Sequence, residues 1–267
     1  MEKKWLFDRR WTKDFTTLRQ EYIKELLVSW RQEMKLASAL DIGCGVGDFS
    51  KFLCDLGYRV TGVDGRRENA AEAQRRYPNM KFDAANAEDL DISRLGTFDV
   101  VLCFGLLYHL ENPFRVIRHM HEMTEKLLLI ETMCLPADNA AMELLDEGAA
   151  EDQGINYVAF YPSEACLVKM LYRAGFPFVY RFRRLPNDEL FRASPWRKKQ
   201  RTFLAASKVS LSAPNLFLAT ESRRWTPNDL DPWGTGLSRL RHHLFQLQVF
   251  WSRVLAPVRR LVGAKSK

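Results

Sequence analysis

The pattern of hydrophobic and polar residues predicts alternating strands and helices. Apolar residues recur every three or four positions over residues 14–35, which predicts a leading amphipathic helix. Apolar runs then predict strands at 38–43, 59–63, 81–84, 98–104 and 127–131, and helical patterns between them predict helices at 48–56, 68–77 and 114–123. A closing pair of strands is expected at 176–185 and 201–206. The alternation predicts an α/β fold with a doubly wound, mostly parallel sheet of seven strands.

The remaining segments carry other signals. Residues 136–160 show no periodicity, which predicts a lid or substrate loop, and Ser163 is expected to cap a helix that runs to Ala174 and ends at Gly175. Asn112 before Pro113 predicts another helix start. After Lys208 several prolines predict a linker. The predicted organisation is an N-terminal helical segment at 1–35, a main domain at 36–208, and a linker with a basic amphipathic helix at 209–267.

Composition and charge narrow the class of protein. The chain has 267 residues, of which 46% are hydrophobic and 27% charged, as is typical of soluble globular proteins. We expect neither a membrane span nor a secretory signal, and five cysteines without CxxC spacing indicate reduced thiols and a cytoplasmic location. Residues 1–174 hold 22 basic and 28 acidic residues, whereas residues 175–267 hold 18 and 5.

The basic C-terminal region predicts a partner. Within residues 235–267 apolar side chains recur at helical spacing and basic side chains flank them. This pattern suits an anionic membrane surface, which would place the protein at the inner face of a membrane, and it equally suits docking on a protein. The run Arg197-Lys198-Lys199-Gln200-Arg201 is typical of a solvated loop, with nucleic acid as the less favoured partner.

A glycine-rich segment follows the first predicted strand. It contains, in order, Asp41, Gly43, Cys44, Gly45, Gly47, Asp48 and Phe49. Glycines at this place allow a tight turn and a close approach of a ligand to the backbone. A dinucleotide fingerprint counted from Gly43 would need glycine where Asp48 stands, and two aspartates would repel a pyrophosphate. The positive sulfonium and ammonium groups of S-adenosylmethionine (SAM) suit these aspartates better, so we expect SAM as the cofactor.

Polar residues follow the next two strands. Asp64, with Gly65 after it, closes the second strand, where its carboxylate suits the two hydroxyls of a ribose. A helix cap is the alternative role for Asp64. Asn86, Ala87 and Glu88 follow the third strand and could bind the adenine edge, although asparagine is common in turns.

These motifs resemble those of the class I SAM-dependent methyltransferases. The resemblance covers about residues 36–208 and rests on residues 41–49, Asp64, 85–90 and 98–113. It implies a Rossmann-like fold, a glycine loop under the methionine part of SAM, Asp64 at the ribose and Asn86-Ala87 beside the adenine. It further implies that the backbone at Cys103 and Phe104 faces the methionine amino group.

A narrower resemblance points to one branch of that family. Residues 103–109, 130–132 and 161–163 are similar to the branch that includes the tRNA wobble-uridine carboxymethyltransferase. This chain departs from that enzyme, since only about 35 residues precede the domain and they show no separate tRNA-binding domain. Ordinary methyl transfer is therefore the expected activity.

Candidate catalytic residues follow the fourth and fifth strands. His109 is the candidate general base, with hydrogen bonding to the following helix as the alternative, and Glu131 is the second candidate. Tyr108 and Tyr161 are candidates to shape the acceptor site, although aromatic residues at such places more often only pack. No metal is expected, since no cluster has ligand spacing.

The expected function is methyl transfer to an oxygen of a small molecule or a glycan, lipid-linked if the C-terminal helix binds a membrane. The alternatives are an RNA-modifying or tRNA-modifying methyltransferase and a catalytically silent SAM-binding scaffold.

Overall fold

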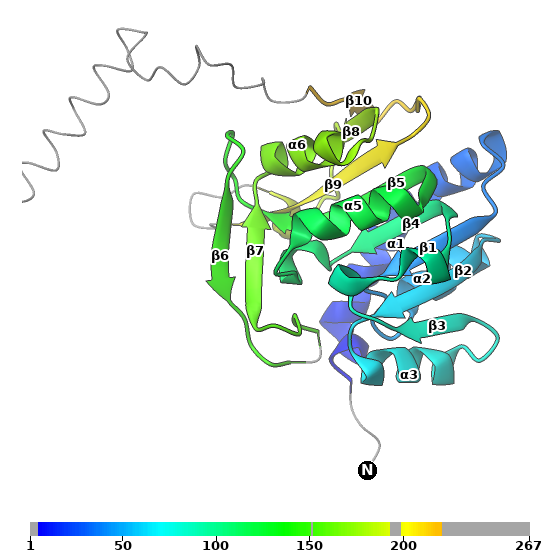
Figure 1. Cartoon of the computed structure of the whole chain (residues 1–267). Helices are drawn as coiled ribbons and strands as arrows, with labels where there is room; N and C mark the ends of the chain where they lie inside the picture. Colours follow the sequence, from blue (N-terminus) through cyan, green and yellow to red (C-terminus); the bar gives the residue numbers. More distant parts are fainter. Residues whose placement is uncertain (1–4, 151, 193–198, 221–267) are drawn as a thin grey trace, which may run out of the picture. The chain divides into compact units, whose positions relative to one another are not determined.

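The computed structural model describes residues 5–150, 152–192 and 199–220, and these form a large sheet with helices on both faces (Figure 1). The sheet has eight strands in the order β10-β8-β9-β5-β4-β1-β2-β3. The bounds are β1 Ser38–Ile42, β2 Arg59–Asp64, β3 Lys81–Ala84, β4 Phe98–Phe104, β5 Thr124–Cys134, β8 Phe178–Phe182, β9 Gln200–Ser207 and β10 Leu216–Leu218.

Strand direction confirms a mostly parallel sheet. The strands β3, β2, β1, β4 and β5 pair in parallel, whereas β9, β8 and β10 add antiparallel pairs at the other edge. The sheet has one strand more than the predicted seven, because β10 pairs with β8 where the prolines predict a linker. This part of the chain is tied down further, since the N–H of Leu211 donates to the hydroxyl of Tyr180 over 2.9 Å.

Helices cover both faces of the sheet. Their bounds are α1 Arg10–Glu33, α2 Asp48–Asp55, α3 Arg67–Arg76, α4 Ile92–Leu95, α5 Pro113–Met123 and α6 Glu164–Ala174, with short 3-10 turns η1 Leu6–Asp8, η2 Ala87–Asp89, η3 Leu107–His109 and η4 Glu189–Phe191. Leu128 and Ile130 of β5 pack with α5 and α6, whereas Leu127 and Leu129 pack in the cluster that contains α1 and α2. Neighbouring residues of one strand thus bury against opposite helical layers, which explains the continuous apolar runs.

The segment predicted as an irregular lid is a β-hairpin. β6 (Met142–Asp146) pairs antiparallel with β7 (Val158–Pro162) and forms a separate two-stranded sheet (Figure 1). The prediction of a 25-residue loop at 136–160 is therefore wrong. Four of the five residues of β6 are exposed, so the strand lacks the alternation that marks a half-buried strand.

Helix termini follow the predicted chemistry in one case and not in another. The Ser163 hydroxyl accepts from the N–H of Cys166 at the start of α6, and Gly175 ends that helix at φ +114°, as predicted. Asn112 precedes α5 but makes no cap hydrogen bond, because its amide donates to the Glu88 carboxylate instead.

The predicted amphipathic helix at 235–267 lies outside the described residues, as do Arg197 and Lys198. In the described ranges, none of the helices combines the length and the hydrophobicity that crossing a membrane requires.

Candidate active site

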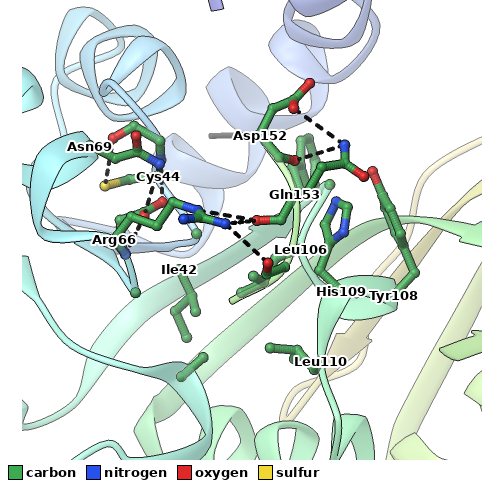
Figure 2. Close-up of a pocket in the computed structure, with 18 of the residues that line it drawn as sticks. Ile42, Cys44, Arg66, Asn69, Leu106, Tyr108, His109, Leu110, Asp152 and Gln153 are labelled. Carbon is green, nitrogen blue, oxygen red and sulfur yellow. Dashed lines mark hydrogen bonds between the residues drawn. The ribbon is translucent and has the colours of Figure 1, made fainter. Parts of the chain in front are cut away.

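A cavity of about 360 Å³ lies where β1, β2 and β4 end (Figure 2). The neighbours of β1 are β2 on one side and β4 on the other. After β3 the chain therefore returns to the other side of β1, and the order in which strands are added to the sheet reverses there. Ligands of doubly wound sheets bind beyond the carboxyl ends of the strands at such a switch point. The first part of the wall is the segment after β1.

Glycines shape this segment. Gly43, Gly45 and Gly47 have φ values of +75°, +55° and +91°, which favour glycine. A Cβ atom on Gly43 would lie 2.8 Å from Cβ of Leu106, and one on Gly45 would lie 2.9 Å from the Phe7 ring. Of the residues in this segment that were predicted to bind the cofactor, Gly43, Cys44, Gly45, Asp48 and Phe49 border the cavity, and Gly47 does not.

Asp64 fixes the wall at the end of β2. One oxygen of its carboxylate accepts from the N–H of Gly45 at 2.9 Å. The other accepts from the N–H of Arg66 at 2.9 Å and from the Asn69 amide at 3.1 Å. Burial raises the pKa of Asp64, and these hydrogen bonds oppose the rise. Asp64 and Gly65 border the cavity, so the Asp64 carboxylate lies at the part of the wall where a contact with the ribose was predicted.

Asp41 and Cys103 do not border the cavity, contrary to the prediction that they contact the cofactor. The Asp41 carboxylate accepts from the Ser50 hydroxyl at 2.6 Å beneath the loop. Burial raises the pKa of Asp41 to about 7, the Ser50 hydrogen bond opposes this rise, and the charge of Asp64 adds to it. Asp41 is therefore partly neutral near pH 7. Of the two residues at the end of β4 that were predicted to face the cofactor, only Phe104 borders the cavity.

The residues after β3 border the cavity, but structural roles occupy their side chains. The Asn86 side chain accepts from the N–H of Glu88 and thus caps η2. The Glu88 carboxylate accepts from the N–H of Glu111 and from the Asn112 amide, each at 2.7 Å. Asn86, Ala87 and Glu88 therefore connect the cavity wall to the start of α5.

His109 borders the cavity beside a carboxylate that the sequence did not suggest. Its Nδ1 lies 2.6 Å from Oε1 of Glu147, which follows β6, and both side chains are buried. The other Glu147 oxygen accepts from the N–H of Gly154 at 2.9 Å. In Figure 2 the His109 ring lies beside Tyr108, with a distance of 3.9 Å between the ring centroids.

Glu131 does not face the cavity, so the prediction that it orients or deprotonates an acceptor is wrong. Its side chain has no exposed surface, and its two oxygens accept from Arg19 Nη1 at 2.8 Å and from Arg201 Nη1 at 2.6 Å. Burial raises the pKa of Glu131, but the charges of Arg201 and Arg19 outweigh this effect and hold the pKa below its ordinary value. Glu131 is an ionised partner of two arginines.

The two predicted acceptor tyrosines do border the cavity, and each contacts a cation. The Tyr108 hydroxyl accepts from Arg201 Nη2 at 2.9 Å, and the Tyr161 hydroxyl accepts from Lys199 Nζ at 3.2 Å. Arg201 is buried, which contradicts the expectation of a solvated loop for this part of the basic run.

Further wall residues come from segments for which no role in the site was predicted. Helix α1 begins earlier than predicted, and Phe7, Trp11, Phe15 and Arg19 of η1 and α1 border the cavity. The four-residue spacing of the three aromatic residues is a helical signal that could have revealed this. Arg66 donates to the carbonyl oxygens of Gln153 and Gly154, which ties the hairpin to the end of β2 (Figure 2).

The sequence and the fold have known counterparts. Residues 40–126 match a family described as a methyltransferase domain. The fold is similar to the N-terminal domain of EvdMO1, crystallised with S-adenosylhomocysteine (SAH), at a TM-score of 0.59 and 20% identity over 70% of this chain and 80% of that one. It is also similar to magnesium protoporphyrin IX methyltransferase of Synechocystis, crystallised with SAM, at a TM-score of 0.52 and 20% identity over 78% and 87% of the chains.

The fold, with its glycine loop and acidic strand end, is that of a Rossmann-like methyltransferase. Residues 40–126 thus match a methyltransferase domain, and the fold around them is similar to that of SAM-dependent methyltransferases.

Sequence relatives cover part of this chain. The ubiquinone biosynthesis O-methyltransferase of Albidiferax ferrireducens is 34% identical over 108 residues, which are 38% of this chain and 40% of the relative. The protein of the same name from Pseudomonas syringae pv. tomato is 34% identical over 110 residues, 39% of this chain and 47% of the relative. The matched regions thus span less than half the length of these relatives.

The Asp64 geometry predicts the effect of one substitution on cofactor affinity. In Asp64→Asn an NH2 group replaces one of the two carboxylate oxygens. The donor of Gly45, or the two donors of Arg66 and Asn69, then meets another donor instead of an acceptor. We expect the affinity for SAH to fall about 10- to 100-fold, the equivalent of a charged hydrogen bond. Titration calorimetry measures this. Asp55→Asn, an exposed aspartate on α2, is the control, and unchanged SAH affinity in Asp64→Asn would contradict the assignment.

The raised pKa of Asp41 predicts a pH dependence of stability. The folded state binds the Asp41 proton more tightly than the unfolded chain does. The contribution of this proton to the free energy of unfolding is therefore fully present below about pH 4 and is lost as the pH rises to about 7. The loss cannot exceed about 1.4 kcal/mol per pH unit for one proton. In Asp41→Asn we expect this decline to be absent when urea unfolding is measured at pH 5 and pH 8. A decline equal to that of the parent protein would count against a buried, proton-binding Asp41.

Proposed function

We propose that the protein transfers the methyl group of SAM to an oxygen of a small molecule. The proposed acceptors include a glycan, either free or linked to a lipid. The observation that carries this proposal is the buried pair of His109 and Glu147 at the cavity. An acceptor hydroxyl must lose a proton when it takes up a methyl group, and a histidine next to a carboxylate is suited to accept it. The name O-methyltransferase of the sequence relatives supports transfer to oxygen.

The cavity wall fits SAM in shape and in charge. The wall after β1 is backbone of Gly43, Cys44 and Gly45, where Cβ atoms at either glycine would collide with neighbouring side chains. We assign this segment to the methionine part, together with the backbone at Phe104. Asp64 would accept from the ribose hydroxyls, and Asn86-Ala87 would flank the adenine. The bound cofactor supplies an activated methyl group on a positively charged sulfur.

His109 is oriented for proton transfer by its contact with Glu147. Nδ1 lies 2.6 Å from the carboxylate, although without the alignment of a hydrogen bond, and we assign the other ring nitrogen, Nε2, to the acceptor hydroxyl. The negative charge of Glu147 stabilises the imidazolium that forms when the proton arrives. His109 would therefore act as the general base and Glu147 as its positioning residue.

The hairpin closes the site around this pair. A Cβ atom on Gly154 would lie 2.6 Å from the carbonyl oxygen of His109, so only glycine fits between the hairpin and η3. Arg66 holds the same turn through the carbonyls of Gln153 and Gly154. The arrangement keeps the hairpin against the cavity, which favours exclusion of water during methyl transfer.

The pair predicts a separation of catalysis from binding. We expect His109→Gln to lower methyl transfer by about 100-fold or more, the usual contribution of a general base, and to leave SAH affinity unchanged. Glu147→Gln should lower the rate by about tenfold, since it removes only the stabilising charge. The measurement is transfer of labelled methyl groups from SAM to a panel of phenols and catechols, with SAH calorimetry alongside.

Glu143→Gln is the matched control for the hairpin, because Glu143 is an exposed carboxylate on β6. Equal rates in the parent protein and His109→Gln would exclude His109 as the base. Tight SAH binding without transfer to any member of the panel would favour the silent SAM-binding scaffold.

A further inference from the structure

Three cations border the cavity on the side of Tyr108 and Tyr161. We call these residues the cationic wall: Arg19 of α1, Lys199 directly before β9, and Arg201 of β9. Arg19 and Arg201 are buried, whereas Lys199 is exposed. The three residues come from opposite ends of the described chain and converge on one cavity.

The cationic wall has more positive charges than it has carboxylate partners among the described residues. Glu131 lies behind the wall and accepts one hydrogen bond from each arginine, so the two arginines share a single carboxylate. The contact of Lys199 is with the hydroxyl of Tyr161. Five other carboxylates border the cavity, and each has a different partner: Asp48 lies 3.8 Å from Lys13 Nζ, and Asp152 accepts from the Gln153 amide. Asp64 accepts from Gly45, Arg66 and Asn69, Glu88 from Glu111 and Asn112, and Glu147 lies beside His109 and accepts from Gly154. The wall therefore holds excess positive charge at the cavity.

Its remaining donors have weak partners or none among the described residues. Arg201 Nη2 donates to the neutral hydroxyl of Tyr108, and Lys199 Nζ to that of Tyr161. Arg19 Nε is buried and lacks a hydrogen-bond partner among the described residues. A buried donor without a partner is costly, and guanidinium and ammonium groups bind carboxylate or phosphate more strongly than a neutral hydroxyl.

We propose that the cationic wall binds an anionic group, a carboxylate or a phosphate, carried by the methyl acceptor. This inference rests on the proposed function, because it names the class of acceptor for that site. The position favours the acceptor, since Tyr108 contacts both Arg201 and the ring of His109. The anion would be held next to the base, which orients the acceptor hydroxyl toward it.

The carboxylate of the cofactor has the same chemistry, so the test is made on protein saturated with SAH. Benzoate and phenyl phosphate are titrated into this complex by calorimetry. The neutral references are benzamide, which is isosteric with benzoate, and phenol, which lacks the phosphate group. We expect each anion to bind about tenfold more tightly than its neutral reference. Because SAH already supplies its own carboxylate, a preference for added anions reports a separate anion subsite.

Two variants localise that preference. In Arg201→Gln, where Glu131 keeps Arg19 as its partner, the preference for benzoate should disappear, and in Lys199→Gln it should fall about threefold. Arg10→Gln and Lys51→Gln remove exposed charges that do not border the cavity and should leave the preference unchanged. Thermal unfolding and SAH affinity verify that each variant is folded, and the exposed Lys199 gives a test that does not depend on a buried position.

Equal binding of the anions and their neutral references, or no binding of any of them, would overturn the inference. So would a preference that survives in both wall variants. If Arg201→Gln weakens binding of SAH but not of methylthioadenosine, which lacks the carboxylate, and the parent shows no benzoate preference, the wall serves the cofactor and the inference is wrong. Failure of SAH to bind the parent protein would instead contradict the proposed function.

Discussion

The site depends on the position of one buried carboxylate, that of Asp64. Its two oxygens accept from the backbone of Gly45, the backbone of Arg66 and the Asn69 amide. These donors belong to the loop after β1, the segment after β2 and helix α3. Parallel strands place these ends at one edge of the sheet, and the carboxylate then joins them into a single wall. These donors are uncharged amide groups, and an acidic side chain at this place suits a ribose and a cationic cofactor.

A second buried carboxylate has the opposite role. Glu131 is surrounded by cations rather than by neutral donors, so its charge is neutralised and the site gains the excess of Arg19 and Arg201. The cavity is therefore acidic at the strand ends and basic beside Tyr108 and Tyr161. His109 lies between these regions and has its own carboxylate, Glu147. Binding of a cofactor, proton transfer and recognition of an acceptor are thus separated in space within one cavity.

The sequence predicted those parts of the fold that depend on residues close together along the chain. Strand β4 has the predicted bounds, because its apolar run and the turn residues around it specify a buried strand. Hairpin β6–β7 escaped prediction because β6 is mostly exposed. The glycine loop and Asp64 were found because their spacing is local. Arg19 pairs with Glu131 across 112 positions and Arg201 across 70, and no periodicity encodes such contacts.

The central claim is that this cavity binds a cationic adenosyl cofactor rather than a phosphorylated dinucleotide. Parallel calorimetric titrations of the unmodified protein with SAH, with the charged SAM analogue sinefungin and with NADH test it most directly. Saturable binding of SAH and sinefungin at one site, with no heat from NADH beyond dilution, is the expected result. Tight binding of NADH together with indifference to SAH would contradict the account.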